Sequence, residues 1–273
     1  MKRIIFVLLV LLAASSLVEA AGRYSRIVSL APSITEILFA LGLDEQIVGV
    51  TNFCDHPEGA LKKPKIGGMS NPSIEAVVRL RPDLVILTTD GNPKYMEERL
   101  KSLHIKTYVF RARRISELPE GIRNLGKFIG IEETADGLAS RIETGIRSFS
   151  SPRGRVGKKR GVLFVIWPDP LIVAGPGTAI DDALNILGLK NLAGDSLTNY
   201  PRYSLEELIR KDPDIIFIGK GHEDMKEMAE NLKRRIGPVR AVREGRVYIV
   251  SDALYRLGPR VLEGIKELAG YLE

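Results

Sequence analysis

Two stretches of the chain carry the same pattern of hydrophobic and polar positions. They are Ser73–Leu87 (SIEAVVRLRPDLVIL) and Ser204–Ile218 (SLEELIRKDPDIIFI), which share Ser, Glu, Arg, Pro and Asp in register. Each stretch predicts a helix with a Ser N-cap, then a Pro-Asp turn and a buried strand of branched apolar residues. Because a solenoid array needs more copies at a shorter period, two widely spaced copies predict two similar lobes.

The rest of the pattern predicts strands that alternate with helices in both halves of the chain. This alternation favours mostly parallel sheets that are covered by helices. Besides the two repeats, the expected strands are residues 26–30, 46–50, 107–110, 162–167 and 247–250. The expected helices are residues 32–41, 94–103, 116–129, 224–235 and 259–272, with a further capped helix within 176–189.

One long amphipathic helix is expected from Ile131 to Ser150. Its apolar positions step by three or four residues: Ala135, Leu138, Ile142, Ile146 and Phe149. The sequence therefore predicts an N-terminal lobe at residues 23–130, an inter-lobe helix at 131–150 and a C-terminal lobe at 156–273. The expected fold class is α/β, with two similar Rossmann-like lobes joined by one long helix and a ligand crevice at the carboxyl ends of the strands.

The first twenty residues have the pattern of a secretory signal peptide. Lys2 and Arg3 precede an apolar run at residues 4–12, and small residues lead to an expected cleavage after Ala20. A retained membrane anchor is the alternative, but spanning takes about 20 apolar residues. Cys54 is the only cysteine, and no Cys follows the apolar run for lipidation. We expect a non-lipidated periplasmic protein that its core holds together without disulfides.

Composition and charge indicate an ordinary globular chain. Of 273 residues, 44% are hydrophobic and 27% charged, and the net charge of +6 is scattered along the sequence. A local basic cluster lies at residues 153–160, which we interpret as a solvated turn. Neither disorder nor nucleic-acid binding is expected.

Enzymatic signatures are sparse. The chain has no Gly-X-Ser-X-Gly elbow and no Walker loop, and GPGTAI at Gly175 lacks the third Gly of a dinucleotide fingerprint. His56, His104 and His222 show no metal-ligand spacing. We therefore predict no catalytic and no metal-binding residues. A two-lobed, glycosyltransferase-like enzyme that uses Asp252 and Arg256 stays open as an alternative, as does a metal-ion carrier.

The loops expected at the crevice combine aromatic and soft apolar side chains with polar ones. Such a mixture suits a large, flat, partly polar ligand. The candidates are Phe53, Met69, Trp167, Tyr200 and Tyr203, beside Asp252, Arg256 and Arg260.

Glu75 and Glu206 occupy the same place in the two repeats, in the first turn of each predicted helix. The helix dipole by itself stabilises a carboxylate there, by about 0.3–1 kcal/mol. Glu207 completes a Ser-X-X-Glu capping box in the second repeat, which leaves Glu206 spare for another task. One carboxylate on each lobe would form a bivalent contact for a two-fold partner with basic sockets.

Several motifs resemble one family. They are RIVSLAPSITEILFALG, the NFCDHP and GGMSNPSIE loops, RPDLVIL and SDALYRLGPR, which together span the chain after the predicted signal peptide. The chain resembles the substrate-binding proteins of ABC importers for cobalamin, haem and iron-siderophores, the class III periplasmic binding proteins. Its resemblance is closest to the cobalamin-binding (BtuF-like) branch.

The resemblance implies a monomer that captures a corrinoid and delivers it to an ABC permease dimer. It implies that Glu75 and Glu206 dock on permease arginines. It also implies ligand contacts at positions that match the branch: Phe53, Tyr200, Asp252 and Arg256. Met69 and Thr88 stand where the branch can carry Trp, so the predicted aromatic box is sparser. Haem and a ferric siderophore therefore stay open as ligands.

Overall fold

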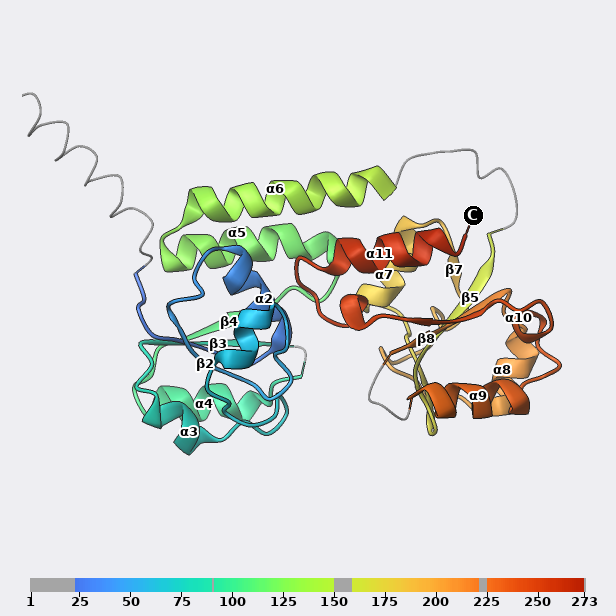
Figure 1. Ribbon diagram of the computed structural model, residues 1–273, viewed down its shortest axis with the longest axis horizontal. Helices are drawn as coiled ribbons and strands as arrows, with labels where there is room; N and C mark the ends of the chain where they lie inside the picture. Colours follow the sequence, from blue (N-terminus) through green and yellow to red (C-terminus); the bar gives the residue numbers. More distant parts are fainter. Residues whose placement is uncertain (1–22, 90, 150–158, 221–224, 273) are drawn as a thin grey trace, which may run out of the picture. The chain divides into compact units, whose positions relative to one another are not determined.

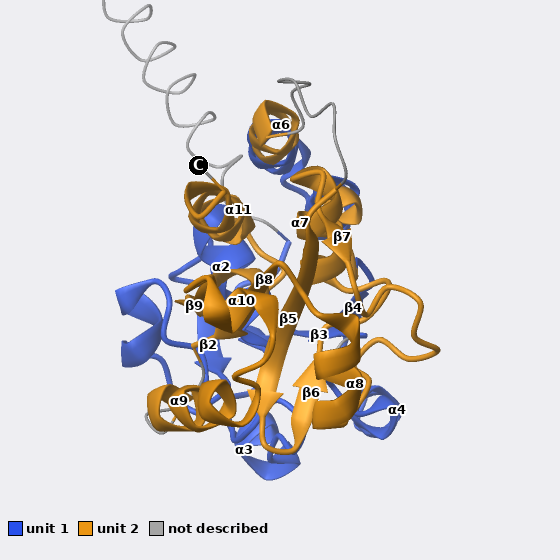
Figure 2. Cartoon of the chain, turned by 90° about the vertical axis from the view of Figure 1, so that its right-hand side faces the viewer, with its two compact units in different colours: residues 1–112, 119–141 blue, residues 113–118, 142–273 orange. Residues whose placement is uncertain are grey.

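The computed structural model describes residues 23–89, 91–149, 159–220 and 225–272 (Figure 1). The chain divides into two compact units: unit 1 is residues 1–112 and 119–141, and unit 2 is residues 113–118 and 142–273 (Figure 2). The division falls within helix α6 (Glu132–Phe149), the long helix that the sequence predicts. The predicted lobe boundaries stay a prediction. The predicted signal peptide and most of the basic cluster at 153–160 lie outside the described residues.

Unit 1 contains a parallel sheet with the strand order β2-β1-β3-β4. The strands are β1 (Ile27–Ser29), β2 (Ile47–Val50), β3 (Leu84–Thr88) and β4 (Thr107–Phe110). The helices are α2 (Pro32–Ala40), α3 (Ile74–Arg79), α4 (Lys94–Ser102) and α5 (Leu118–Ile129), with a 3-10 turn η1 (Glu58–Lys62). The strands and helices predicted here are confirmed to within about two residues at each end.

The two faces of the unit 1 sheet are covered by different helices. Alternate strand residues such as Val28 and Val85 pack with Val77 of α3 and Leu100 of α4 in one buried cluster. Helix α2 contacts β1, β2 and β3, and Figure 1 shows α2 and α5 on the side of the sheet opposite α3 and α4. Because side chains alternate along a strand, both faces need apolar residues, which explains the continuous apolar run of β3.

Unit 2 repeats this arrangement with one addition. Its strands are β5 (Gly161–Pro168), β6 (Leu171–Val173), β7 (Lys190–Asn191), β8 (Ile215–Gly219) and β9 (Val247–Val250). Strands β7, β5, β8 and β9 are parallel and follow the same order as β2, β1, β3 and β4. The addition is β6, which pairs antiparallel with the carboxyl end of β5, while β7 pairs with its beginning (Figure 2). This topology confirms the expected α/β fold class with mostly parallel sheets.

Five α-helices follow α6 in the described part of unit 2. They are α7 (Ala179–Ile186), α8 (Leu205–Lys211), α9 (Met225–Arg235), α10 (Arg240–Arg243) and α11 (Val261–Gly270), with the 3-10 turn η3 (Asp252–Leu254). The 3-10 turn η2 (Ile115–Glu117), which also belongs to unit 2, precedes α6. Leu208 of α8 and Leu232 of α9 pack with Leu163 and Ile216 on one face of the sheet. On the other face, Phe164 and Phe217 form an aromatic pair. Strands β6 and β7 and helix α10 are not among the elements expected from the sequence.

The Asp of each repeat ties the repeat to the first strand of its unit. Asp83 accepts hydrogen bonds from the backbone N–H groups of Ser25 (2.8 Å) and Arg26 (3.0 Å), and Asp214 accepts one from Gly161 (2.7 Å). Burial raises the pKa of both carboxyls, but the hydrogen bonds that they accept lower it by more. Arg240 lowers the pKa of Asp214 further, so that both pKa values lie below the usual range. The shared Asp is thus a scaffold residue.

Candidate functional site

In unit 1, the loop after β2 presents Phe53 to solvent. The Phe53 side chain is 51% exposed, and its ring lies beside Gly68. Backbone hydrogen bonds cross the loop, from Asn52 N–H to Gly67 O (2.9 Å) and from Ile66 N–H to Val50 O (3.0 Å). A large exposed aromatic side chain on an ordered loop is available to contact a flat ligand.

Asn92 ties Met69 to the carboxyl ends of two strands. Its Oδ1 accepts from Thr88 N–H, and its Nδ2 donates to Leu30 O and to Met69 O, each at 2.8 Å. The Met69 side chain packs over Gly91, where φ is +104° and a Cβ would have no room. Asn92 is not among the residues expected from the sequence to form the site, because Asn in a Gly-Asn-Pro turn is an ordinary turn residue.

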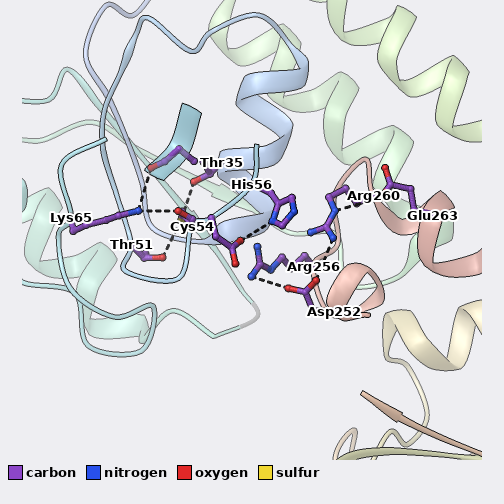
Figure 3. Close-up of polar contacts among 11 residues, drawn as sticks. Thr35, Thr51, Cys54, His56, Lys65, Asp252, Arg256, Arg260 and Glu263 are labelled. Atoms are coloured by element: carbon purple, nitrogen blue, oxygen red, sulfur yellow. Dashed lines mark hydrogen bonds and ion pairs between the residues drawn. The ribbon is translucent and has the colours of Figure 1, made fainter. Parts of the chain in front are cut away.

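A polar cluster surrounds Cys54 in the loop after β2 that carries Phe53 (Figure 3). The Thr35 hydroxyl donates to the Cys54 thiol at 3.2 Å, and the Thr51 hydroxyl lies 3.1 Å from the same sulfur. Lys65 Nζ donates to the carbonyl oxygens of Cys54 (2.9 Å) and Ala60 (3.2 Å). The buried side chains of Thr35, Thr51 and Cys54 are thus paired, and the exposed Lys65 holds the backbone carbonyl of Cys54, next to Phe53.

In unit 2, Trp167 lies near the carboxyl end of β5. The indole is partly buried against the unit 2 core, and its Nε1–H donates a 2.7 Å hydrogen bond to the backbone carbonyl of Asp169. Tyr200 lies in the segment before α8, and its side chain is 46% exposed. Tyr203, another candidate, is 6% exposed and belongs to the core, which makes it a packing residue.

Asp252 lies between two arginines (Figure 3). Arg256 Nη2 is 2.9 Å from one carboxylate oxygen, and Arg260 Nη2 is 3.3 Å from the other. The arginine side chains are only 14% and 18% exposed, so these pairs are screened less than surface pairs. Glu263 lies 3.6 Å from Arg260 Nε and is itself 72% exposed. Asp252 therefore orients two arginines, and Glu263 adds a second carboxylate beside Arg260.

Tyr255 lies in the same segment and faces the core of unit 2. Its ring packs edge-on against Phe164, and its hydroxyl lies directly over Gly219, where any Cβ would clash. The hydroxyl is buried and has no hydrogen-bond partner among the described residues. Burial, followed by the charges of Asp252 and Tyr200, raises the pKa of the phenol well above its usual value. Tyr255 is thus a neutral phenol at physiological pH.

Glu75 is held at the start of α3 by the residue that caps the helix. The Ser73 hydroxyl accepts from Ala76 N–H (3.1 Å) and donates to a Glu75 carboxylate oxygen (3.0 Å). A hydrogen bond from its own backbone N–H, followed by the bond from Ser73, lowers the pKa of the Glu75 carboxyl. The carboxylate is fully exposed, ionised and oriented.

The start of α8 has the same arrangement. The Ser204 hydroxyl accepts from Glu207 N–H at 3.1 Å and also hydrogen-bonds the Glu206 side chain. The hydrogen bond from the backbone N–H of Glu206, followed by the bond from Ser204, lowers the pKa of the exposed Glu206 carboxyl. The expectation that a capping box with Glu207 leaves Glu206 spare is therefore wrong. Ser204 hydrogen-bonds Glu206 as Ser73 hydrogen-bonds Glu75.

The candidate residues thus lie in two sets. Phe53 and Met69 follow strands of unit 1, and Trp167, Tyr200, Asp252 and Arg256 belong to unit 2. Their contacts with a ligand stay predictions.

Two structural features are absent from the described ranges, residues 23–89, 91–149, 159–220 and 225–272. Within them, no group of three or more His, Cys, Asp or Glu side chains could hold a metal ion. In the same ranges, no helix combines the length and apolar character needed to cross a membrane.

Comparisons with known proteins agree with this architecture. The periplasmic binding protein family matches residues 27–254. The uncharacterized ABC transporter substrate-binding lipoprotein YvrC of Bacillus subtilis is 32% identical over 253 residues, which are 89% of this chain and 78% of YvrC.

Two of the solved structures that are similar in fold are those of a vitamin B12-binding and a haem-binding protein. The periplasmic vitamin B12-binding protein BtuF of Vibrio cholerae has a TM-score of 0.78 and 25% identity, over 91% of this chain and 96% of BtuF. The periplasmic haem-binding protein RhuT of Roseiflexus sp. RS-1, in its apo form, has a TM-score of 0.82 and 27% identity, over 90% of this chain and 97% of RhuT. Together with the match over residues 27–254, these similarities show that the chain belongs to the periplasmic binding protein family.

Proposed function

We propose that this chain captures a corrinoid of the cobalamin type in the periplasm and delivers it to an ABC permease. The observation that carries the delivery step is the oriented carboxylate at the same position of both units, Glu75 and Glu206. Similarity to BtuF supports the corrinoid. In this proposal Phe53, Met69, Trp167 and Tyr200 supply apolar contacts, and Asp252 with Arg256 supplies polar ones.

Haem is the second candidate ligand, and similarity to RhuT supports it. Arg256 and Arg260, which Asp252 orients, are guanidinium groups of the kind that pairs with ligand carboxylates. The haem-binding protein RhuT is as similar in sequence and fold as BtuF. A ferric siderophore with acidic groups is open for the same reason.

Calorimetric titration with cyanocobalamin, haem and a ferric siderophore tests the ligand. We expect one of them to bind, and the absence of a binding signal for all three would overturn the proposal. Phe53→Ala and Tyr200→Ala should each weaken binding about tenfold or more, since buried aromatic contacts dominate such interfaces. Tyr95→Ala is the matched control, because Tyr95 is 59% exposed on α4 and should leave affinity unchanged.

Charge reversal tests the delivery step. The double variant Glu75→Lys, Glu206→Lys should abolish binding to the permease and transport, because both carboxylates become repulsive. Its ligand affinity should equal that of the unaltered protein. Glu98→Lys with Glu244→Lys is the control, since both residues are exposed and lie outside the two helix starts. Normal transport by the first double variant would refute docking through these glutamates.

The proposal involves no chemical change of the ligand. Recovery of the bound ligand with unchanged mass supports this, whereas a modified ligand would favour the glycosyltransferase-like alternative. We further propose a monomer that is exported, cleaved near Ala20 and not lipidated, since Cys54 is buried in unit 1. Light scattering tests the monomer, and the intact mass of the exported protein tests the cleavage and the absence of a lipid. A mass that includes an acyl group, as expected for the lipoprotein YvrC, would refute the absence of a lipid.

A further inference from the structure

A recess of about 250 Å³ lies beside Glu206 in unit 2. Its walls are the turn between β5 and β6 (residues 168–171), the segment that leads into α8 (residues 202–206) and Arg235 at the end of α9. A second hollow of about 230 Å³ adjoins it, because both share Pro168, Asp169 and Arg235. The second hollow continues along α9 past Leu232. The two form a groove that begins at the candidate docking carboxylate.

The walls of this groove are held by backbone pairing. Tyr203 N–H donates to Leu171 O (2.9 Å), Val173 N–H donates to Pro201 O (3.1 Å), and Ile172 bridges Arg202 in antiparallel fashion. The start of α8 is therefore fixed to β6, the strand without a counterpart in unit 1. The recess has the preformed shape that a docking surface needs, since little ordering is required on binding.

The rim of the recess carries both signs of charge. Asp169 and Glu206 are acidic, and Arg202 and Arg235 are basic. Asp169 lies 3.7 Å from Arg235, yet its side chain is 71% exposed, so it is accessible to a second cation. Proline and leucine side chains of the turn supply the apolar part of the wall. This combination fits a peptide segment with a basic side chain beside apolar ones.

The same turn contacts a candidate ligand residue. Trp167 Nε1–H donates its 2.7 Å hydrogen bond to the backbone carbonyl of Asp169, whose side chain lines the recess. Binding of a peptide segment to this turn would therefore disturb the hydrogen bond that holds the Trp167 indole. The link is short and lies wholly within unit 2.

We propose that the groove beside Glu206 receives an arginine- or lysine-bearing loop of the ABC permease, and that its docking displaces Trp167 through Asp169. The inference rests on the proposed function and deepens it. Continuity with Glu206 and the exposed carboxylate of Asp169 favour the permease as the occupant.

The first experiment measures binding to the permease of the same organism, reconstituted in nanodiscs. Asp169→Lys should weaken binding about tenfold, because the change replaces attraction by repulsion at the rim. Asp195→Lys is the matched control: Asp195 is 74% exposed and, like Asp169, paired with one basic residue, Lys211. Its binding should stay within about twofold of the unaltered protein. Equal binding by Asp169→Lys and the control would overturn the inference.

A charge swap separates docking from local structure. Asp169→Lys combined with Arg235→Glu restores an ion pair in the recess but reverses its direction. If Asp169 only supports the turn, the swap restores permease binding; if it contacts a basic loop, binding stays weak. Restoration by the swap would therefore refute the docking role.

Trp167 is the only tryptophan, so 5-fluorotryptophan labelling gives one ¹⁹F signal. We expect that signal to shift when unlabelled permease is added, with and without cyanocobalamin. An unmoved signal under saturating permease would refute the link to Trp167. Failure of the unaltered protein to bind any permease would instead refute the proposed function.

Discussion

The Ser73 hydroxyl donates a 3.0 Å hydrogen bond to the Glu75 carboxylate while it accepts one from the backbone of the same helical turn. One hydroxyl thus caps α3 and orients the side chain proposed to meet the permease. Ser204 serves α8 and Glu206 in the same way. The repeat therefore couples helix stability to the direction of an exposed charge.

Ser73→Ala should lower the free energy of unfolding by about 1 kcal/mol, since it removes an N-cap. It should also weaken permease binding, because Glu75 loses its orienting partner. Chemical denaturation and a binding assay on the same sample measure the two effects. Ser73→Thr keeps the hydroxyl and should restore both; a Thr variant as weak as the Ala variant would contradict the hydrogen-bond explanation.

The pKa values of Glu75 and Glu206 lie below the usual value, so their charge should persist in mild acid. Docking that needs both carboxylates ionised is then lost only as the pH falls through these lowered pKa values, below the ordinary Glu value of about 4.3. Carbon NMR titration of the side chains tests this directly. Removal of both cap hydroxyls should move each titration to higher pH, and an unchanged midpoint would contradict the role of the serines.

Asp214→Asn should destabilise the protein by about 1–3 kcal/mol, because it weakens the bonds to Gly161 and Arg240 at a site that is only 24% exposed. The folded-state pKa of Asp214 is depressed. Its contribution to stability is therefore fully present above the unfolded value of about 3.9 and is lost as the pH falls through the folded value.

Urea unfolding at several pH values tests this linkage. The unaltered protein should lose stability more steeply on acidification than Asp214→Asn does. Asp195→Asn is the control, since Asp195 is 74% exposed and its pair with Lys211 should contribute less than about 1 kcal/mol. Parallel pH profiles for the unaltered protein and Asp214→Asn would rule out this role.

Tyr255→Phe should leave the melting temperature unchanged or raise it, because the buried hydroxyl has no hydrogen-bond partner among the described residues. Gly219→Ala should instead destabilise strongly, since its Cβ would collide with the Tyr255 side chain. Calorimetric melting of both variants checks the contrast. A large loss of stability in Tyr255→Phe would mean that the hydroxyl is paired in solution.

Cys54 should react with a disulfide reagent only when the protein unfolds, because its side chain is 1% exposed and contacts Thr35 and Thr51. Kinetics of thiol modification with and without denaturant measure this. Cys54→Ser should keep the contacts with the hydroxyls and stay folded. Rapid modification of the native protein would show that the loop around Phe53 opens.

Much of the fold could be predicted from the sequence because its signals are local. The Ser caps, the apolar strands and the spacing of the α6 positions each involve residues a few positions apart. Strands β6 and β7 were missed because each is recognised by its pairing with β5 rather than by its own short sequence.

For the candidate site, the sequence by itself determined which residue types follow the strands and that Glu75 and Glu206 hold equivalent positions. Only the tertiary structure decided that Asn92 holds Met69, that Asp252 orients two arginines, and that Ser204 engages Glu206. It also placed Asp169 both under Trp167 and in the recess beside Glu206. The physical reason is that hydrogen bonds and cavities depend on which side chains the packing of distant segments brings within a few ångströms, whereas caps and periodicity are properties of neighbouring residues.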